Sequence, residues 1–249
     1  MVYAALTFWL LVVVLTAWGV QQLLGGLVKP KVFNTILLPG TLVAQLGHVL
    51  GLLITGATVS NTTLIKDDEE GAPETTPDPK PRIPVVGPVI IGMLPLLACG
   101  IAIFFVSASL GDPVIANVHV TVVGDTLPTS MPAFWDLLRS LITLIESFVD
   151  AIALANLGNG KVLLFLYLLV CLAVRMAPFP GYLRGSLAAI VILGIAAAVI
   201  ASLTDAADPR VQSGWAVLNL SVATLLFLLL ISLLVRGCVG LIKLLRGED

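Results

Sequence analysis

The chain has 249 residues, of which 58% are hydrophobic and 11% are charged, and its formal net charge is −2. Soluble globular domains carry about a quarter charged residues, so this composition excludes that class and predicts a polytopic membrane protein. The near-neutral charge, without a basic cluster, also excludes a nucleic-acid-binding protein.

The first predicted element is a membrane-spanning helix over residues 3–24. No Lys or Arg precedes this apolar run, and the run is longer than the core of a signal peptide, so we expect an uncleaved anchor within residues 1–32. A second apolar helix is expected over residues 33–57, opened by Pro39 and Gly40 and closed by a glycine, Gly56.

This second helix carries two polar residues at its centre, Gln45 and His48. They are three residues apart, so they share one helical face. A polar side chain at that depth in an apolar helix has to find a partner or a function.

Two extramembrane segments follow the second helix. Residues 57–65 are rich in β-branched residues and predict a short strand at the membrane surface. Residues 66–84 contain four consecutive acids and five prolines, a composition that predicts an exposed, mobile acidic loop.

Residues 85–108 predict a third spanning helix, kinked by internal prolines. Residues 111–128 alternate in polarity with period two, so we expect a strand or hairpin outside the bilayer. His119 lies in this segment and is a second candidate metal ligand, although a histidine exposed on a strand needs no metal.

Residues 132–157 predict an amphipathic helix with one polar side. The charged residues of that side are candidates for contact with a partner: Asp136, Arg139, Glu146 and Asp150. The helix either lies in the membrane interface or crosses with its polar stripe turned toward a partner or a cavity.

The distribution of basic residues favours the interfacial placement. It puts eight Lys and Arg residues on one side of the membrane and four on the other, whereas a crossing helix gives a nearly even split. The eight are Lys66, Lys80, Arg82, Arg175, Arg184, Arg236, Lys243 and Arg246, and the four are Lys29, Lys31, Lys161 and Arg210. Both termini are then expected to be cytoplasmic.

Three further spanning helices are expected over residues 161–176, 185–203 and 215–235, and a basic tail over 236–249 that lies along the headgroups. The expected fold is an all-α polytopic membrane protein with about six transmembrane helices, one amphipathic interfacial helix and short extramembrane strands. Residues 1–249 form one integral membrane domain: an anchor over 1–32, a core over 33–203 that contains the acidic loop 66–84, and a last helix with its tail over 204–249.

The helix over residues 33–57 resembles the active-site helix of the site-2-protease-like intramembrane zinc metalloproteases. The family pattern is P-G-x-x-x-H-E-x-x-H, and here its proline and glycine fall on Pro39 and Gly40. Its first histidine falls on Ala44, its glutamate on Gln45 and its second histidine on His48. Alanine has no lone pair for zinc, and glutamine cannot act as the general base. The helix therefore keeps the proline, the glycine and the spacing of the pattern, but it lacks a zinc ligand and the catalytic base.

Two further blocks resemble the same family. Residues 90–100, IIGMLPLLACG, are similar to its G-x-x-P-L-L-x-G helix, and residues 175–185, RMAPFPGYLRG, are similar to the run N-x-A-P-S-x-x-D-L-R-G that supplies the third zinc ligand. The position of that aspartate is Tyr182. The resemblance therefore leaves one ligand of three and implies no catalytic residue, no metal and no cofactor.

The resemblance implies a catalytically inactive member that serves as a structural or partner-binding subunit in a complex of integral membrane proteins. In that arrangement Ala44, Gln45, His48 and Tyr182 mark the degenerate active site, and the last three are expected to form a metal-free polar cluster. An active protease that uses displaced ligands, for example His48 with His119, Asp136 or Glu146, is one alternative. A small transporter or channel is another.

Overall fold

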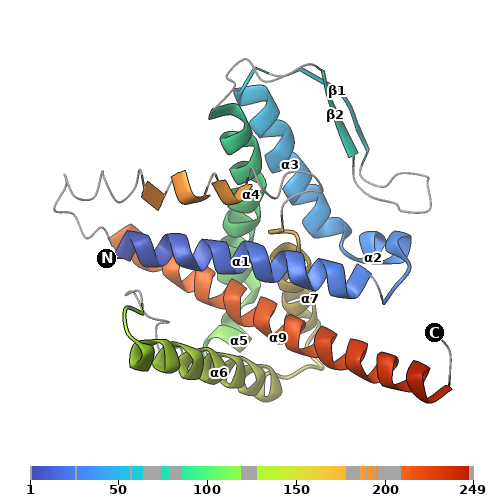
Figure 1. The fold of residues 1–249 in the computed structure, drawn as a ribbon, viewed down its shortest axis with the longest axis vertical. Helices are drawn as coiled ribbons and strands as arrows, with labels where there is room; N and C mark the ends of the chain where they lie inside the picture. Colours follow the sequence, from blue (N-terminus) through green and yellow to red (C-terminus); the bar gives the residue numbers. More distant parts are fainter. Residues whose placement is uncertain are drawn as a thin grey trace.

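The computed structural model describes residues 2–25, 27–56, 58–63, 74–78, 86–118, 128–177, 186–188, 190–192, 194–195 and 209–246. They form helices and one antiparallel pair of strands (Figure 1). The helices are α1 Val2–Gly25, α2 Pro30–Ile36, α3 Leu38–Ile54, α4 Val86–Leu110, α5 Asp112–Ile115, α6 Met131–Leu154, α7 Gly160–Val174 and α9 Pro209–Arg246, and the strands are β1 Thr58–Thr63 and β2 Glu74–Asp78.

The helices form two layers that cross (Figure 1). One layer contains α1 and α9, side by side, and the other contains α3, α4 and α7. Helix α6 packs on α9 and lies away from α3. Apolar side chains from α1, α4, α6, α7 and α9 meet in the largest core cluster, which includes Val13, Ile103, Phe148, Phe165 and Val222.

Among the described residues, three helices are long and apolar enough to cross a membrane: Ala4–Gly25, Gly87–Leu110 and Val217–Leu241. Two further apolar helices, α3 and α7, have 17 and 15 residues and are shorter than a typical span of about 20. The fifth expected span in chain order, 185–203, lies mostly outside the described residues.

The expected single helix over residues 33–57 is instead two helices, α2 and α3, separated by a break at Leu37. The physical reason is Pro39, which lacks an N–H and whose ring clashes with the carbonyl of Thr35 in a continuous helix. The other end agrees with the expectation, because Gly56 follows the helix with a φ of 75°.

Helix α3 has the opposite polarity pattern to a helix of a soluble protein. Its small and polar residues are buried, and its leucines are exposed. The buried residues are Gly40, Thr41, Ala44, Gln45, Gly47, His48, Gly51 and Leu52, and the exposed apolar residues are Leu42, Leu46, Leu50, Leu53 and Ile54. A hydrocarbon surrounding favours this pattern, since helices in lipid associate through small and polar faces.

The acidic loop expected over residues 66–84 contains β2, which pairs with β1 in an antiparallel register of Thr58 with Asp78 and Thr63 with Glu74. The prediction of a loop without structure is therefore wrong for Glu74–Asp78. Main-chain pairing with β1 requires no buried apolar surface, which is why composition did not reveal it. The strand β1 lies within the segment 57–65 for which a strand was expected.

The strand expected over residues 111–128 is absent from its described part, where Asp112–Ile115 is the helical turn α5. Pro113 in the first turn fixes a helical φ, and the Asn117 side chain donates a hydrogen bond to the Pro113 carbonyl at 3.0 Å. His119 lies outside the described residues.

Helix α6 is close to the expected amphipathic helix over residues 132–157. The Ser130 side chain caps it by accepting a hydrogen bond from the Ala133 N–H at 3.3 Å, and Pro132 follows in the first turn. The last helix also differs from expectation, because α9 continues without a break through Arg236 to Arg246 instead of turning into a separate tail.

Helices α1 and α9 run in the same direction (Figure 1). Residues near the start of α1, such as Trp9, belong to the same core cluster as Leu218, whereas Val20 packs with Leu228 and Leu229 further along α9. The start of α1 is therefore at the opposite end of this pair from the end of α9.

Candidate functional site

Three of the positions that the resemblance assigns to a degenerate active site are described, and they lie on the buried side of α3. Ala44, Gln45 and His48 are 1%, 3% and 4% exposed. The His48 imidazole forms a hydrogen bond with the backbone of Ile91 in α4. Both Gln45 and His48 have interaction partners. The side of the helix that would present zinc ligands is thus closed against another helix.

Two glycines bring α3 this close to α4. A methyl group at Gly47 would lie 2.7 Å from the carbonyl oxygen of Leu94, and one at Gly51 would lie 3.0 Å from the Cα of Ile91. The two glycines are four residues apart, so they form a single groove for the α4 backbone. His48 lies between them in sequence, and its hydrogen bond with the Ile91 backbone places its ring at the contact between the helices.

The break between α2 and α3 packs against α7 to form what we call the junction, defined by Asn34, Ile36, Gly40, Cys171 and Arg175. The hydroxyl of Tyr167 donates to the Ile36 carbonyl at 2.8 Å, and the Cys171 thiol donates to the same oxygen at 3.5 Å. These donors satisfy a carbonyl that the helix break leaves without a helical partner. Gly40 lies directly on the Cys171 backbone, with no space for a Cβ atom.

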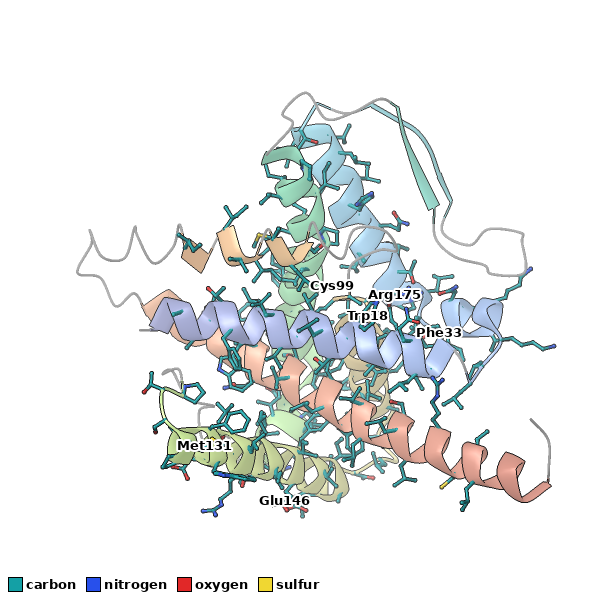
Figure 2. All side chains as sticks on the ribbon, in the orientation of Figure 1. Trp18, Phe33, Cys99, Met131, Glu146 and Arg175 are labelled. Atoms are coloured by element: carbon teal, nitrogen blue, oxygen red, sulfur yellow. The ribbon has the colours of Figure 1, made fainter. Side chains whose placement is uncertain are left out.

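A buried arginine lies at this junction. Arg175 is 7% exposed, and its Nη2 donates to the Asn34 side-chain oxygen at 2.6 Å. Its Nε is buried without a hydrogen-bond partner. Its carbonyl accepts from the Cys99 thiol at 3.8 Å, so the residue lies beside the middle of α4 (Figure 2).

Arg175 is buried within the protein, a position that the charge count made from the sequence did not consider when it placed this residue on one side of the membrane. Sequence reasoning also missed its partner Asn34. One signal in the sequence could have indicated that Arg175 is buried. It lies between an apolar run and the apolar Met176 and Ala177, and no polar segment there marks the end of the span.

The described residues of the three blocks that carry the family resemblance lie together; of the third block these are Arg175, Met176 and Ala177. The first packs on the second through Gly47 and Gly51, as above. The third begins at Arg175, beside Gly40 and Cys99. Just after the third block, the Ser186 hydroxyl donates to the Gly92 carbonyl at 3.4 Å. Tyr182 lies outside the described residues, so the expected contact with Gln45 and His48 stays a prediction.

The candidate partner-contact residues of α6, namely Asp136, Arg139, Glu146 and Asp150, are all exposed. Figure 2 shows Glu146 on the outer edge of this helix. Because α6 lies away from α3, the structure does not bring Asp136 or Glu146 to His48. Within the described ranges, no group of three or more His, Cys, Asp or Glu side chains could hold a metal ion.

Comparisons of the chain with protein-family models, curated proteins and solved structures found no match.

Proposed function

We propose that the chain is a catalytically inactive, site-2-protease-like membrane protein that works as a structural or partner-binding subunit of a membrane protein complex. The observation that carries this proposal is the closed contact between α3 and α4. The face that the resemblance assigns to zinc buries Ala44, Gln45 and His48, and His48 bonds the Ile91 backbone of α4.

The resemblance is supported by the spatial arrangement of its three blocks. They are separated by long stretches of sequence, yet their described residues pack around one segment of α4, between Ile90 and Gly100. A chance likeness among three apolar motifs gives no reason for them to meet.

The loss of activity follows from the residue types. Hydrolysis needs a metal-bound water and a base to take its proton, and a single histidine supplies neither a zinc site nor that base. An enzyme with displaced ligands has less support, because Asp136 and Glu146 lie on a helix away from His48.

The resemblance is tested by restoring the family's ligand set. The variant Ala44→His, Gln45→Glu, Tyr182→Asp is expected to bind about one zinc ion per chain, measured by elemental analysis after purification in mild detergent. The double variant without Tyr182→Asp is the matched control and should bind zinc more weakly. If the folded triple variant holds no zinc, the positions have been matched wrongly.

The partner-binding role is tested on the polar side of α6. Replacing Asp136, Glu146 and Asp150 with their amides keeps the shape of each side chain and removes its negative charge. A partner that binds this surface should then be lost from the purified complex. Asp112→Asn, an exposed acid on α5, is the control. If the variant retains every co-purifying protein, the polar side of α6 does not bind the partner.

A transporter or channel is a second candidate, favoured by one observation. The apolar helices α3 and α7 are both short, and the start of one meets the end of the other at the buried Arg175, as half-helices do around the binding sites of transporters. The uptake of a small anion into liposomes that contain the pure protein, measured against empty liposomes, separates this function from the first.

The parallel arrangement of α1 and α9 also bears on topology. Parallel neighbours that both cross a bilayer place the N-terminal end of α1 and the C-terminal end of α9 on opposite sides. This favours termini on opposite faces, in place of the two cytoplasmic termini that the charge distribution predicts.

A further inference from the structure

We propose that Arg175 is one half of an intermolecular ion pair, and that a partner membrane helix supplies the other half as an Asp or Glu side chain. This inference rests on the proposed partner-binding function and names the chemistry of one contact within it.

Arg175 has no buried countercharge among the described residues. Arg175 is 7% exposed, and no acidic residue is among the buried polar residues of the described structure. Within the described residues, Arg175 donates to a neutral amide, that of Asn34, and its buried Nε has no partner there. A buried cation in apolar surroundings is costly unless an anion accompanies it, and the described part of the chain supplies none to Arg175.

Cys99, whose thiol contacts the Arg175 carbonyl, is twelve residues from Gly87 and eleven from Leu110, the ends of the α4 span. At 1.5 Å per residue it lies about 17 Å from either end, near the middle of a hydrocarbon core of about 30 Å. Lipid phosphates lie outside that core, so a headgroup does not fit this position.

The side chains of Ile36 and Tyr167 at the junction are 53% and 42% exposed, and the neighbouring Leu163 and Leu164 on α7 are 53% and 47% exposed. Ile36 and Tyr167 form an exposed surface at the junction, and Leu163 and Leu164 continue it along α7, 12 and 11 residues before Arg175. A helix packed on that surface would bring a short acidic side chain to Arg175, while its apolar residues cover the leucines.

The test uses two synthetic transmembrane helices, Leu-rich peptides that carry one central Asp or one central Asn. Energy transfer between labelled peptide and labelled full-length protein in liposomes measures their association. The Asp peptide is expected to bind about tenfold more tightly than the Asn peptide, because a charged hydrogen bond is stronger than a neutral one. The difference should vanish in Arg175→Met and persist in Arg175→Lys, while Arg236→Met, an exposed control, leaves it unchanged.

A second measurement keeps the proposal testable if the peptides pack poorly. Without partner, Arg175→Met should melt at the same or a higher temperature than the wild type, because it removes an unpaired buried charge. A large drop would mean that the chain supplies its own carboxylate and would overturn the proposal. Acetate that raises the melting temperature of the wild type alone would also overturn it, in favour of a small-anion site.

The two proposals can fail separately. If native companions stay bound to Arg175→Met, the partner-binding function stands and the ion pair is excluded. If the wild type has no companions, yet discriminates between the two peptides, the arginine site stands without the proposed complex.

Discussion

Single glycines decide how closely the central helices approach. At Gly47 the nearest α4 atom to an added methyl group is a backbone oxygen at 2.7 Å, and backbone cannot rotate away as a side chain can. The small residues of α3 are therefore part of the contact that buries His48.

We expect Gly47→Ala to destabilise the protein by about 1–3 kcal/mol through overpacking. Thermal unfolding in mild detergent measures this, with Gly237→Ala as the control, since nothing lies within 4 Å of a methyl group there. Both changes raise helix propensity, so only the contact distinguishes them. Equal melting temperatures for the two variants would contradict the close approach.

The sequence could predict the polar positions of α3 but not the polar contact between α2 and α7. Spacing alone placed Gln45 and His48 on one face, and both are buried on it. The pairing of Arg175 with Asn34 joins residues 141 positions apart, and no local pattern encodes such a distance. The Tyr182 position in the candidate site remains a prediction.

At the scale of elements, the break between α2 and α3 is stabilised from outside. Pro39 explains why the helix breaks, and the local sequence therefore contained that signal, although we expected an uninterrupted helix. The donor that satisfies Ile36 comes from α7, which the local sequence does not reveal.

Removing that donor with Tyr167→Phe should cost about 0.5–1.5 kcal/mol, because the Ile36 carbonyl loses its hydroxyl partner. Thermal unfolding provides the measurement, and Phe165→Leu is a comparison that alters packing in the same helix without touching a hydrogen bond. An unchanged melting temperature for Tyr167→Phe would show that the Cys171 thiol alone suffices.

Helix α6 has three different sides. One packs on α9, where Phe148 and Phe227 meet edge to face at 6.1 Å, and one carries the exposed charges. The third is an exposed apolar stripe of Met131, Trp135, Ile142 and Val149. Periodicity showed the amphipathic character, but only tertiary packing separates the apolar side into a protein-facing and an outward-facing part.

We predict that this stripe faces lipid, so that α6 lies in the membrane interface. A variant with Trp135 as its only tryptophan, the other three being changed to Phe, should be quenched strongly by brominated lipids. Quenching by aqueous acrylamide without quenching by the lipids would place the stripe in water.

For the described part of the molecule, the helices form two crossing layers, an arrangement that the expectation of about six transmembrane helices did not include. Hydropathy reveals the length of each apolar segment, but not the direction in which neighbouring helices run or how they cross. Helices α1, α4 and most of α9 were therefore predictable, whereas the parallel pairing of α1 with α9 was not.

That pairing predicts termini on opposite sides of the membrane. Cysteines placed singly at the two ends of a variant without native cysteines should differ in labelling by an impermeant maleimide in sealed, oriented vesicles, with one reactive and one protected until detergent is added. Equal labelling of both ends would support the charge distribution and exclude α1 and α9 as parallel spans.

The central claim is that this protein is a metal-free partner subunit, and one purification tests it most directly. The tagged chain is isolated in mild detergent, its companions are identified by mass spectrometry, and zinc is measured on the same sample. The account predicts stoichiometric membrane-protein companions and no zinc. One zinc ion per chain that disappears in His48→Ala would contradict it and restore the protease as the leading interpretation.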